Sequence, residues 1–368
     1  MSPPGKWLNG NAYTPFAEML QLERVEGTED TFRSCSPAFS PGSNTRAYGG
    51  HVYAQAAWAA AQTVGKGFCL HSITGWFTLQ GDTSRPFVYR VRNVRQGGSY
   101  CQRQVDVWQE PDLEKGVCFT AICSFKRPEP TYNDRQHEGD LRAKYKAVLD
   151  GKRPEDWPEA PGVDSPYYWT TERERGYIDP FPGLQSRKVD MSAYNEGKAT
   201  LEKRQLQYYS IIGDMPPVKE QPNLHACAHL YASDRNGLFP IPNFLDLGDQ
   251  YQAIASLSHT VILHVEADGL NMIGPTGKPY WFLHEIEVTR IAHGRAMTNY
   301  KLWREDGVHV ATCVQDGLLR MPPGVAVTTA FAARGKKDVK TVGKGEGDKA
   351  EGEKAGGRTE DERIKGKL

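Results

Sequence analysis

The chain carries no net charge and no long hydrophobic run. Its 45 basic residues balance 45 acidic ones over 368 residues, which gives no electrostatic reason to expect a nucleic acid or an anionic membrane as a partner. No segment approaches the roughly 18 to 20 apolar residues of a membrane span. The start also lacks the basic-then-apolar layout of a secretory signal. We therefore expect a soluble, intracellular protein with no membrane span.

The cysteines show no pattern of a disulfide framework or a metal site. There are seven, an odd number with no C-x-x-C pair, and most stand in apolar stretches. We predict that they are reduced core residues and that none is a catalytic nucleophile, which would need an accessible, electropositive setting. They are Cys35, Cys69, Cys101, Cys118, Cys123, Cys227 and Cys313.

The chain does contain one pattern twice, a helix with a small-residue face followed by strands. Gly49-Gly50 introduces the first helix, and Asn223 is placed to cap the second. Residues at helical spacing are Tyr53, Ala56, Ala57, Ala60, Ala61 and Val64 in the first and Leu224, Cys227, Ala228, Tyr231 and Ala232 in the second. Strand-like segments follow at 70–79 and 256–265. Because alanine faces let a helix lie close to a curved sheet, we predict two α+β units in which a sheet wraps a helix.

Two segments outside these units offer little apolar surface. Residues 129–184 are rich in proline and charge, which is typical of a connection that lies over the surface. From Arg334 on, lysine, glycine and glutamate leave almost nothing to bury. We therefore expect residues 334–368 to form a disordered tail.

Short motifs recur in order through both halves. The first half contains Tyr48-Gly49-Gly50-His51-Val52, Leu70-His71-Ser72, Trp76-Phe77 and Gly81-Asp82, and the second contains Tyr231-Ala232-Ser233-Asp234, Ser256-Leu257-Ser258-His259 and Val314-Gln315-Asp316-Gly317. Each motif alone is weak. Their order and repetition over residues 13–321 resemble the type II acyl-CoA thioesterase family.

The resemblance implies a fold, a domain division and an activity. The fold would be an α+β double hotdog, with two helices packed on one continuous antiparallel sheet. Residues 13–128 would form the N-terminal hotdog domain and residues 185–322 the C-terminal one, which carries the catalytic residues, with 129–184 as the connecting segment. The activity would be hydrolysis of fatty acyl-CoA to free fatty acid and CoA.

The family's catalytic Asp, Ser or Thr, and Gln fall on Asp234, Ser256 and Gln315. A carboxylate, a hydroxyl and a carboxamide can hold one water, with Asp234 as general base and no acyl-enzyme. Gln315 interrupts an apolar strand and needs partners to offset its desolvation. Partial burial at a helix end would raise the pKa of Asp234. In the first half, the residue that corresponds to Gln315 is about Ser124.

Two of these residues also have a plain structural interpretation. Asp234 stands where Asp, Asn and Gly cluster at a helix end, and Ser256 begins a strand, where a serine can bond its own backbone. The sequence departs from the family's common pattern at Arg235, after the aspartate, and at Ser258, where an acidic residue is frequent. These departures leave the fit of the substrate open.

Three more residues are candidates for substrate binding. Gly49 and Gly50 are either a tight entry to the helix or backbone amides that face the thioester oxygen. His71 is either a buried, hydrogen-bonded histidine or a pocket residue beside the thioester. The resemblance favours the pocket for His71.

No metal is expected, although two histidines have a suggestive spacing. His225 and His229 are four residues apart on the second helix, where both could face one ion. Ala226 occupies the position of the glutamate in H-E-x-x-H, and no third ligand is evident. We therefore predict structural histidines, no metal site and no cofactor.

Two other functions remain open. A hotdog enoyl-CoA hydratase or dehydratase pairs an aspartate with a nearby histidine, but no histidine closely follows Asp234, and Gln315 would have no role in hydration. A noncatalytic acyl-CoA-binding protein would keep the fold without activity. Retention of all three motif residues disfavours that reading. The partners we expect are the acyl-CoA substrate and a second copy of the chain in a homo-oligomer.

The last three residues of the tail predict a cellular compartment. It ends in Gly366-Lys367-Leu368, which matches two of the three residues of the S-K-L peroxisomal address. An import receptor reads that address at a free, accessible C-terminus. We predict delivery to peroxisomes, with a cytoplasmic location as the alternative.

Overall fold

The computed structural model describes residues 11–42, 45–110 and 115–323, and the backbone of two later strands. The chain divides into two units, Met1–Met321 and Pro322–Leu368. In the second unit, β13 (Thr328–Ala333) pairs antiparallel with β14 (Lys336–Thr341). The predicted disordered tail therefore contains one paired strand, and the rest of the tail lies outside the described residues.

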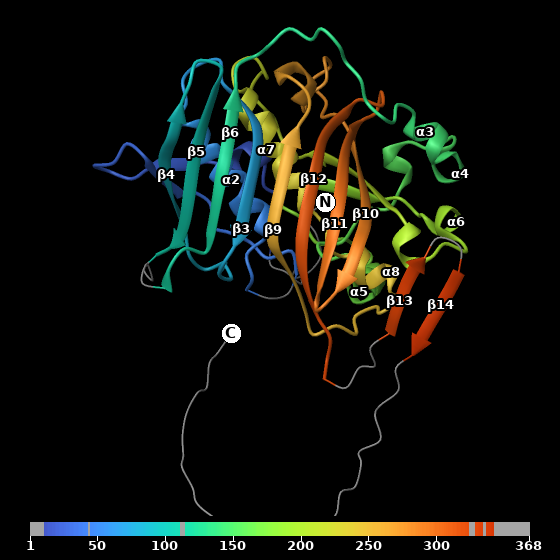
Figure 1. Ribbon diagram of the computed structural model, residues 1–368. Helices are drawn as coiled ribbons and strands as arrows, with labels where there is room; N and C mark the ends of the chain where they lie inside the picture. The colour runs from blue at the N-terminus through green and yellow to red at the C-terminus, as the bar shows by residue number, and fades with distance from the viewer. Residues whose placement is uncertain (1–10, 43–44, 111–114, 324–327, 334–335, 342–368) are drawn as a thin grey trace, which may run out of the picture. The chain divides into compact units, whose positions relative to one another are not determined.

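One antiparallel sheet of 12 strands organises the first unit (Figure 1). In spatial order the strands are β1 (Leu22–Arg24), β2 (Thr31–Ser34), β4 (Phe87–Gln96), β5 (Tyr100–Gln109), β6 (Phe119–Lys126), β3 (Cys69–Phe77), β9 (Ala253–Leu263), β12 (His309–Arg320), β11 (Arg295–Arg304), β10 (Phe282–Ala292), β8 (Gln205–Ile211) and β7 (Leu184–Lys188). The halves of the sequence meet where β3 pairs with β9. The predicted continuous sheet is confirmed.

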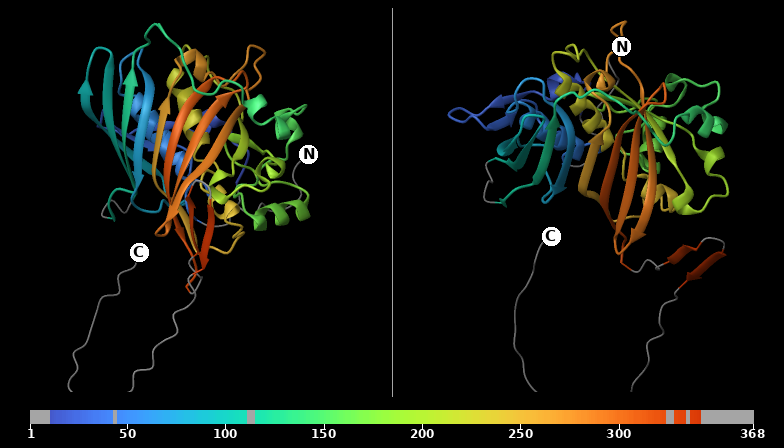
Figure 2. Two further views of the ribbon diagram at one scale, coloured as in Figure 1. Left: turned by 45° about the vertical axis from the view of Figure 1, so that its right-hand side comes forward. Right: turned by 45° about the horizontal axis from the view of Figure 1, so that its top comes forward.

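Two central helices pack against the concave side of this sheet (Figure 2). They are α2 (Gly49–Ala61) and α7 (Pro222–Ser233), and each buries ten of its residues. Their alanines leave room for close approach to the strands. The Tyr53 hydroxyl donates to the carbonyl of Ile73 on β3 at 2.9 Å and lies 3.3 Å from that of His259 on β9. The predicted double hotdog, with two helices on one sheet, is confirmed.

Two local boundaries differ from the sequence prediction. Gln221, not Asn223, is the N-cap of α7, and Pro222 occupies its first turn. The Asn223 side chain instead accepts from the Leu70 amide at 2.7 Å and donates to the Phe68 carbonyl at 3.0 Å. It ties the second helix to a strand of the first half, a long-range bond that helix-cap rules cannot anticipate. Ser256 is also interior to β9, which begins at Ala253.

The connecting segment is more structured than its composition indicates. It contains α3 (Leu141–Lys144), α4 (Lys146–Leu149), the 3₁₀ helix η2 (Pro154–Asp156) and α5 (Pro166–Arg175). Its apolar side chains join those of β8, β10 and β11 in a second core, which includes Leu141, Tyr145, Leu149, Trp157, Leu206, Leu283 and Trp303. The segment therefore covers the far strands of the sheet. The remaining short helices are α1 (Phe16–Met19), α6 (Ser192–Asn195), η3 (Thr200–Glu202), α8 (Pro240–Phe244) and η4 (Ala267–Leu270).

Six of the seven cysteines are buried, as predicted, and all seven are free thiols. The prediction is wrong for Cys35, which is exposed. It follows the end of β2 directly, where the chain leaves the sheet in a bend.

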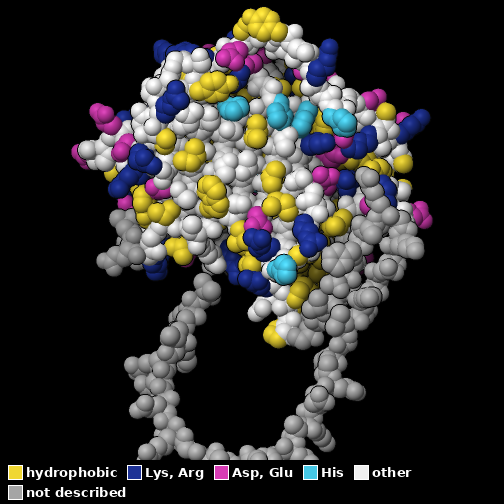
Figure 3. Space-filling model, viewed as in Figure 1, with side chains coloured by type: hydrophobic (Ala, Val, Ile, Leu, Met, Phe, Trp, Pro, Cys, Tyr) yellow, Lys and Arg dark blue, Asp and Glu magenta, His cyan; other side chains and the backbone are white. Residues whose placement is uncertain are grey.

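The opposite, convex side of the sheet is uncovered at its centre. Trp76, Ile122, Ile262 and Val314 are exposed there, and Figure 3 shows hydrophobic side chains scattered among polar ones on this side. Among the described residues, none of the helices has the length and apolarity that a bilayer crossing needs.

Gly75→Ala is expected to destabilise the fold by about 1–3 kcal/mol, the usual cost of overpacking. A Cβ at Gly75, which pairs with His259 at the junction of the halves, would overlap the Phe119 ring and lie 3.1 Å from the Ala121 Cβ. Urea unfolding measures the change. Gly65→Ala is the matched control, because a Cβ there meets nothing within 4 Å. Equal stability of the two variants would contradict the close packing at the junction.

Candidate active site

Asp234 lies at the C-terminal end of α7. The helix ends at Ser233 because the chain turns there, with Asn236 in the left-handed region at φ 58°. Asparagine tolerates that conformation better than most residues. Asp234 directly follows this helix, and its side chain is partly buried.

A β-bulge turns Ser256 toward the helices. Along β9, His259 and Val261 are buried and face the core, so alternation would place Leu257 on the same side. The register with β12 shifts instead: Ser258 pairs with Asp316, and Ser256 pairs with Gly317. The extra residue re-aims the strand, and Ser256 takes the inward position.

Gln315, on the neighbouring strand β12, is the third residue of this group. Its side chain is fully buried on the inner side of β12. The Gln315 Nε2 donates to Asp234 Oδ1 at 2.6 Å and to Ser256 Oγ at 2.6 Å, and the Ser256 hydroxyl lies 3.3 Å from Asp234 Oδ1, to which it donates. The structure thus brings together all three residues that the resemblance named, although they are scattered over the chain.

The carboxyl group of Asp234 is less acidic than usual. Burial raises its pKa from the ordinary 3.8 to about 6, against the lowering effect of hydrogen bonds from Gln315, the Gly50 backbone amide and Ser256. Desolvation of the charged form is therefore stronger than the three donors combined. A carboxylate with a pKa near 6 can accept a proton at neutral pH more readily than a surface aspartate.

Gly49 and Gly50 lie beside this carboxylate. The Gly50 N–H donates to it, at the N-terminus of α2 where the helix dipole favours negative charge. A Cβ at Gly49 would lie 2.9 Å from Asp234 Oδ2 and 3.2 Å from the Phe77 ring. The absence of a side chain at Gly49 therefore lets the start of α2 approach Oδ2 closely.

His71 lies elsewhere. It is the extra residue of the bulge in β3, half-buried beside the Tyr100 ring. Trp76 pairs with Ser258, so His71 is about six residues along the strand from the level of Ser256, roughly 20 Å at 3.3 Å per residue. The structure does not bring His71 to the Asp234 carboxylate.

The two bulges define which residues correspond between the halves. In β3 the bulge falls between Leu70 and Ser72, and in β9 between Ser256 and Ser258. With the bulges aligned, Leu70 corresponds to Ser256, and Cys123 corresponds to Gln315. The expected counterpart, Ser124, is off by one residue, because it faces the other side of the sheet. The first half thus has apolar, buried side chains at both positions.

Two buried residues behind Gln315 escaped the sequence analysis. Tyr300 and Thr298 lie on β11, and the Tyr300 hydroxyl donates to Gln315 Oε1. Thr298 pairs with Gln315 across the strands. Only the strand register reveals this contact, since nothing in the sequence around Tyr300 distinguishes it from any other tyrosine in a strand.

The two histidines of α7 hold neighbouring segments in place. His225 bonds the Pro216 carbonyl at 2.8 Å and the Met272 amide at 3.0 Å. His229 bonds the Tyr209 hydroxyl at 2.9 Å and the Leu270 carbonyl at 3.1 Å. Both ring nitrogens of each histidine are therefore engaged by the protein.

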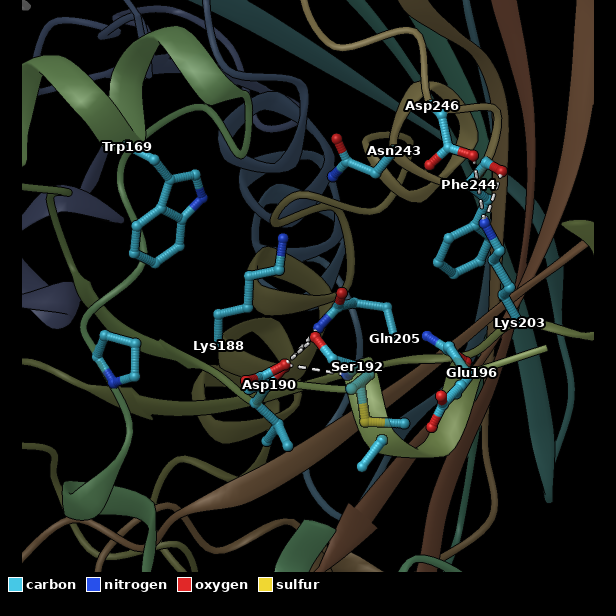
Figure 4. Close-up of a pocket in the computed structure, with 15 residues that line it drawn as sticks. Trp169, Lys188, Asp190, Ser192, Glu196, Lys203, Gln205, Asn243, Phe244 and Asp246 are labelled. Atoms are coloured by element: carbon cyan, nitrogen blue, oxygen red, sulfur yellow. Dashed lines mark hydrogen bonds and ion pairs between the residues drawn. The ribbon is translucent and has the colours of Figure 1, made fainter. Parts of the chain in front are cut away.

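A pocket of about 760 Å³ lies away from Asp234, between β7, α6, β8 and α8 (Figure 4). Its lysines are already paired, Lys188 with Asp164 at 2.7 Å and Lys203 with Asp246 at 3.6 Å. Figure 4 also shows the Ser192 hydroxyl directed at the Asp190 carboxylate. None of Asp234, Ser256 and Gln315 lines this pocket, so we do not place the chemistry there.

Comparison with known proteins agrees with this arrangement. The model of the acyl-CoA thioesterase N-terminal domain matches residues 38–126, and that of the acyl-CoA thioesterase C-terminal domain matches residues 154–319. Human acyl-coenzyme A thioesterase 8 is 26% identical over 321 residues, covering 84% of this chain and 89% of the relative. Acyl-CoA thioesterase 2 of Haemophilus influenzae is 26% identical over 321 residues, covering 82% and 96%.

Solved structures show the same fold. The acyl-CoA thioesterase II TesB2 of Mycobacterium marinum is similar with a TM-score of 0.61 and 25% identity, over 84% of this chain and 100% of that one. A hot dog protein of unknown function from Alicyclobacillus acidocaldarius gives a TM-score of 0.60 at 16% identity, over 83% and 98%. At 16% identity, the similarity to the Alicyclobacillus acidocaldarius protein supports a shared fold only.

The fold and these matches define a double-hotdog thioesterase, an enzyme that hydrolyses thioesters. The two domain matches together span more than half of the sequence. The chain belongs to the type II acyl-CoA thioesterase family, as the sequence resemblance implied.

Asp234→Asn is expected to stabilise the fold at pH 8. Because the folded-state pKa is raised from 3.8 to about 6, stability falls as the pH rises through this interval. The full difference corresponds to roughly 3 kcal/mol, partly offset by weaker hydrogen bonds to an amide. Urea unfolding at pH 8 should show the variant as more stable than the wild type, with the advantage lost at pH 4. A destabilised variant at pH 8 would contradict the buried-charge cost.

Proposed function

We propose that this enzyme hydrolyses fatty acyl-CoA to free fatty acid and CoA through a water molecule that Asp234 activates. The water oxygen attacks the thioester carbonyl carbon, and its proton passes to the Asp234 carboxylate. The carbon–sulfur bond then breaks, and the CoA thiolate leaves and takes up a proton. The observation that carries this proposal is the convergence of the Gln315 amide and the Ser256 hydroxyl on Asp234 Oδ1, at 2.6 Å and 3.3 Å.

The close approach of the start of α2 to Asp234 Oδ2 supports a place for the thioester near Gly49. Gln315 and Ser256 engage Oδ1, and Gly49 lies directly beside Oδ2. The N-terminus of α2 supplies positive potential there. We infer that Gly49 and Gly50 border the reacting thioester and that the positive end of the α2 dipole stabilises the oxygen that becomes negative.

The alternatives account for fewer residues. A hydratase needs a general acid beside the aspartate, but Asp234 is bonded by an amide, a hydroxyl and a backbone N–H. A noncatalytic binding protein gives no reason to keep a carboxylate buried at an energetic cost. His71 is left without a part in the reaction, and its role in binding the substrate stays a prediction.

The halves have different tasks in this proposal. Residues 185–322 supply the base and its two partners, and residues 13–128 supply α2 with Gly49 and Gly50. Residues 129–184 connect them. The apolar counterparts Leu70 and Cys123 in the first half support one reaction centre per chain.

Asp234→Asn should lower kcat by at least 100-fold with oleoyl-CoA, because the amide cannot accept the water's proton. In the wild type, kcat/KM should fall as the pH drops below about 6, where Asp234 becomes protonated. Free CoA release measures both effects. Asp150→Asn, at an exposed aspartate, serves as the control and should keep the wild-type rate. Turnover of Asp234→Asn within tenfold of the wild type would exclude Asp234 as the base.

Peroxisomal delivery, the import receptor and a homo-oligomer stay predictions. Gly366, Lys367 and Leu368 lie outside the described residues. A fluorescent protein that carries residues 357–368 at its C-terminus should accumulate in peroxisomes, and the same fusion without Leu368 should remain diffuse. A diffuse signal from both fusions would remove the peroxisomal prediction and leave the thioesterase activity untouched.

A further inference from the structure

Tyr300 forms the inner end of a hydrogen-bond chain that runs to Asp234. The Thr298 Oγ1 donates to the Tyr300 hydroxyl at 2.7 Å, and the Tyr300 hydroxyl donates to Gln315 Oε1. The amide of Gln315 then donates to Asp234 Oδ1 at 2.6 Å. Thr298, Tyr300 and Gln315 are all at most 1% exposed, so water cannot replace any of these donors.

The donor-to-acceptor direction of these hydrogen bonds decides which end of the Gln315 amide faces Asp234. A carboxamide can turn over and exchange its oxygen and nitrogen at little steric cost. In the reversed orientation Oε1 would face the ionised Asp234 carboxylate, and the base would lose a donor. The acceptor-only carboxylate itself disfavours this orientation, and a donor at the Oε1 end of the amide adds to the preference.

Tyr300 distinguishes the two ends of the Gln315 amide because its hydroxyl proton is directed at Gln315 Oε1. A phenol can donate or accept, but Thr298 Oγ1 donates to its oxygen at 2.7 Å, with the Gln315 backbone carbonyl as a more distant second acceptor at 3.3 Å. The phenol proton is then available to Gln315 Oε1. Burial raises the pKa of Tyr300 well above its ordinary 10.0, so the hydroxyl keeps this proton throughout the working pH range.

The surrounding packing fixes the tyrosine. A Cβ at Gly237 would lie 2.5 Å from the Tyr300 hydroxyl and 2.9 Å from Gln315 Oε1, so the turn after Asp234 closes directly over this contact. The His284 ring packs edge-on against the Tyr300 ring, with centroids 4.9 Å apart. The phenol thus has little freedom to leave Gln315.

We propose that Tyr300 is a positioning residue for thioester hydrolysis: it holds the Gln315 amide in the one orientation that donates to Asp234 and Ser256. This inference rests on the proposed role of Asp234 as the base. Tyr300 does not touch the substrate in this account, and it acts through Gln315.

Tyr300→Phe removes only the hydroxyl, and we expect kcat to fall by about tenfold or more while KM stays within about twofold. A reversed amide withdraws the hydrogen bond that lowers the pKa of Asp234. The acid limb of the kcat/KM profile should therefore move to higher pH, an effect that a general loss of stability would not produce. Tyr209→Phe, which removes another buried hydroxyl on the sheet, should leave the limb in place.

Thr298→Val provides a second, independent variant, because it frees the phenol to turn away from Gln315 without touching the tyrosine. It should lower kcat in the same direction, by about threefold or more, and it decides the question if Tyr300→Phe does not fold. Wild-type kcat and an unmoved acid limb in the folded variants would overturn the positioning role.

Asp234→Asn, assayed in parallel, separates the two proposals. If this variant is inactive and Tyr300→Phe behaves as the wild type, the base stands and the positioning role is wrong. If Asp234→Asn retains turnover, the proposed mechanism itself is wrong.

Discussion

The antiparallel pairing of β3 with β9 is the constraint on which the rest of the molecule depends. It joins two similar halves into one sheet, and it sets α2 and α7 against the same side. The start of α2 then meets the end of α7, so that the Gly50 amide reaches Asp234. A carboxylate can be partly buried at that point because donors from the start of α2 and from two strands surround it. Neither half alone contains all of these groups.

Duplication followed by divergence explains why the site occurs in the second half. The bulge exists in both halves and turns one residue of the strand inward. In the second half this residue is Ser256, which pairs with Gly317 and accepts a hydrogen bond from the Gln315 side chain. In the first half Leu70 and Cys123 fill the equivalent positions and pack in the main core. The same β-bulge therefore directs a polar residue of the candidate site inward in the second half and a hydrophobic core residue inward in the first half.

Much of this could be predicted from the sequence, because the repeated helix and strand patterns reflect local periodicity. Asp234, Ser256 and Gln315 followed from the family's motifs, and no local rule would have brought them together. Other features depend on long-range register. Asn223 bonds β3 instead of capping its helix, Ser124 is one residue from the true counterpart of Gln315, and Tyr300 gained its role only through the β11–β12 pairing. Motif order also could not show that His71 lies far from the carboxylate.

The central claim is that Asp234 acts as a base on water and does not attack the thioester itself. A single turnover in ¹⁸O-labelled water, with enzyme in excess over acyl-CoA, separates the two chemistries. The account predicts one labelled oxygen in the fatty acid from the first turnover and no label in the peptide that contains Asp234. Attack by the carboxylate would form an anhydride, and its opening by water at the Asp234 carbonyl would leave the label in Asp234 and an unlabelled fatty acid. That result would contradict the account.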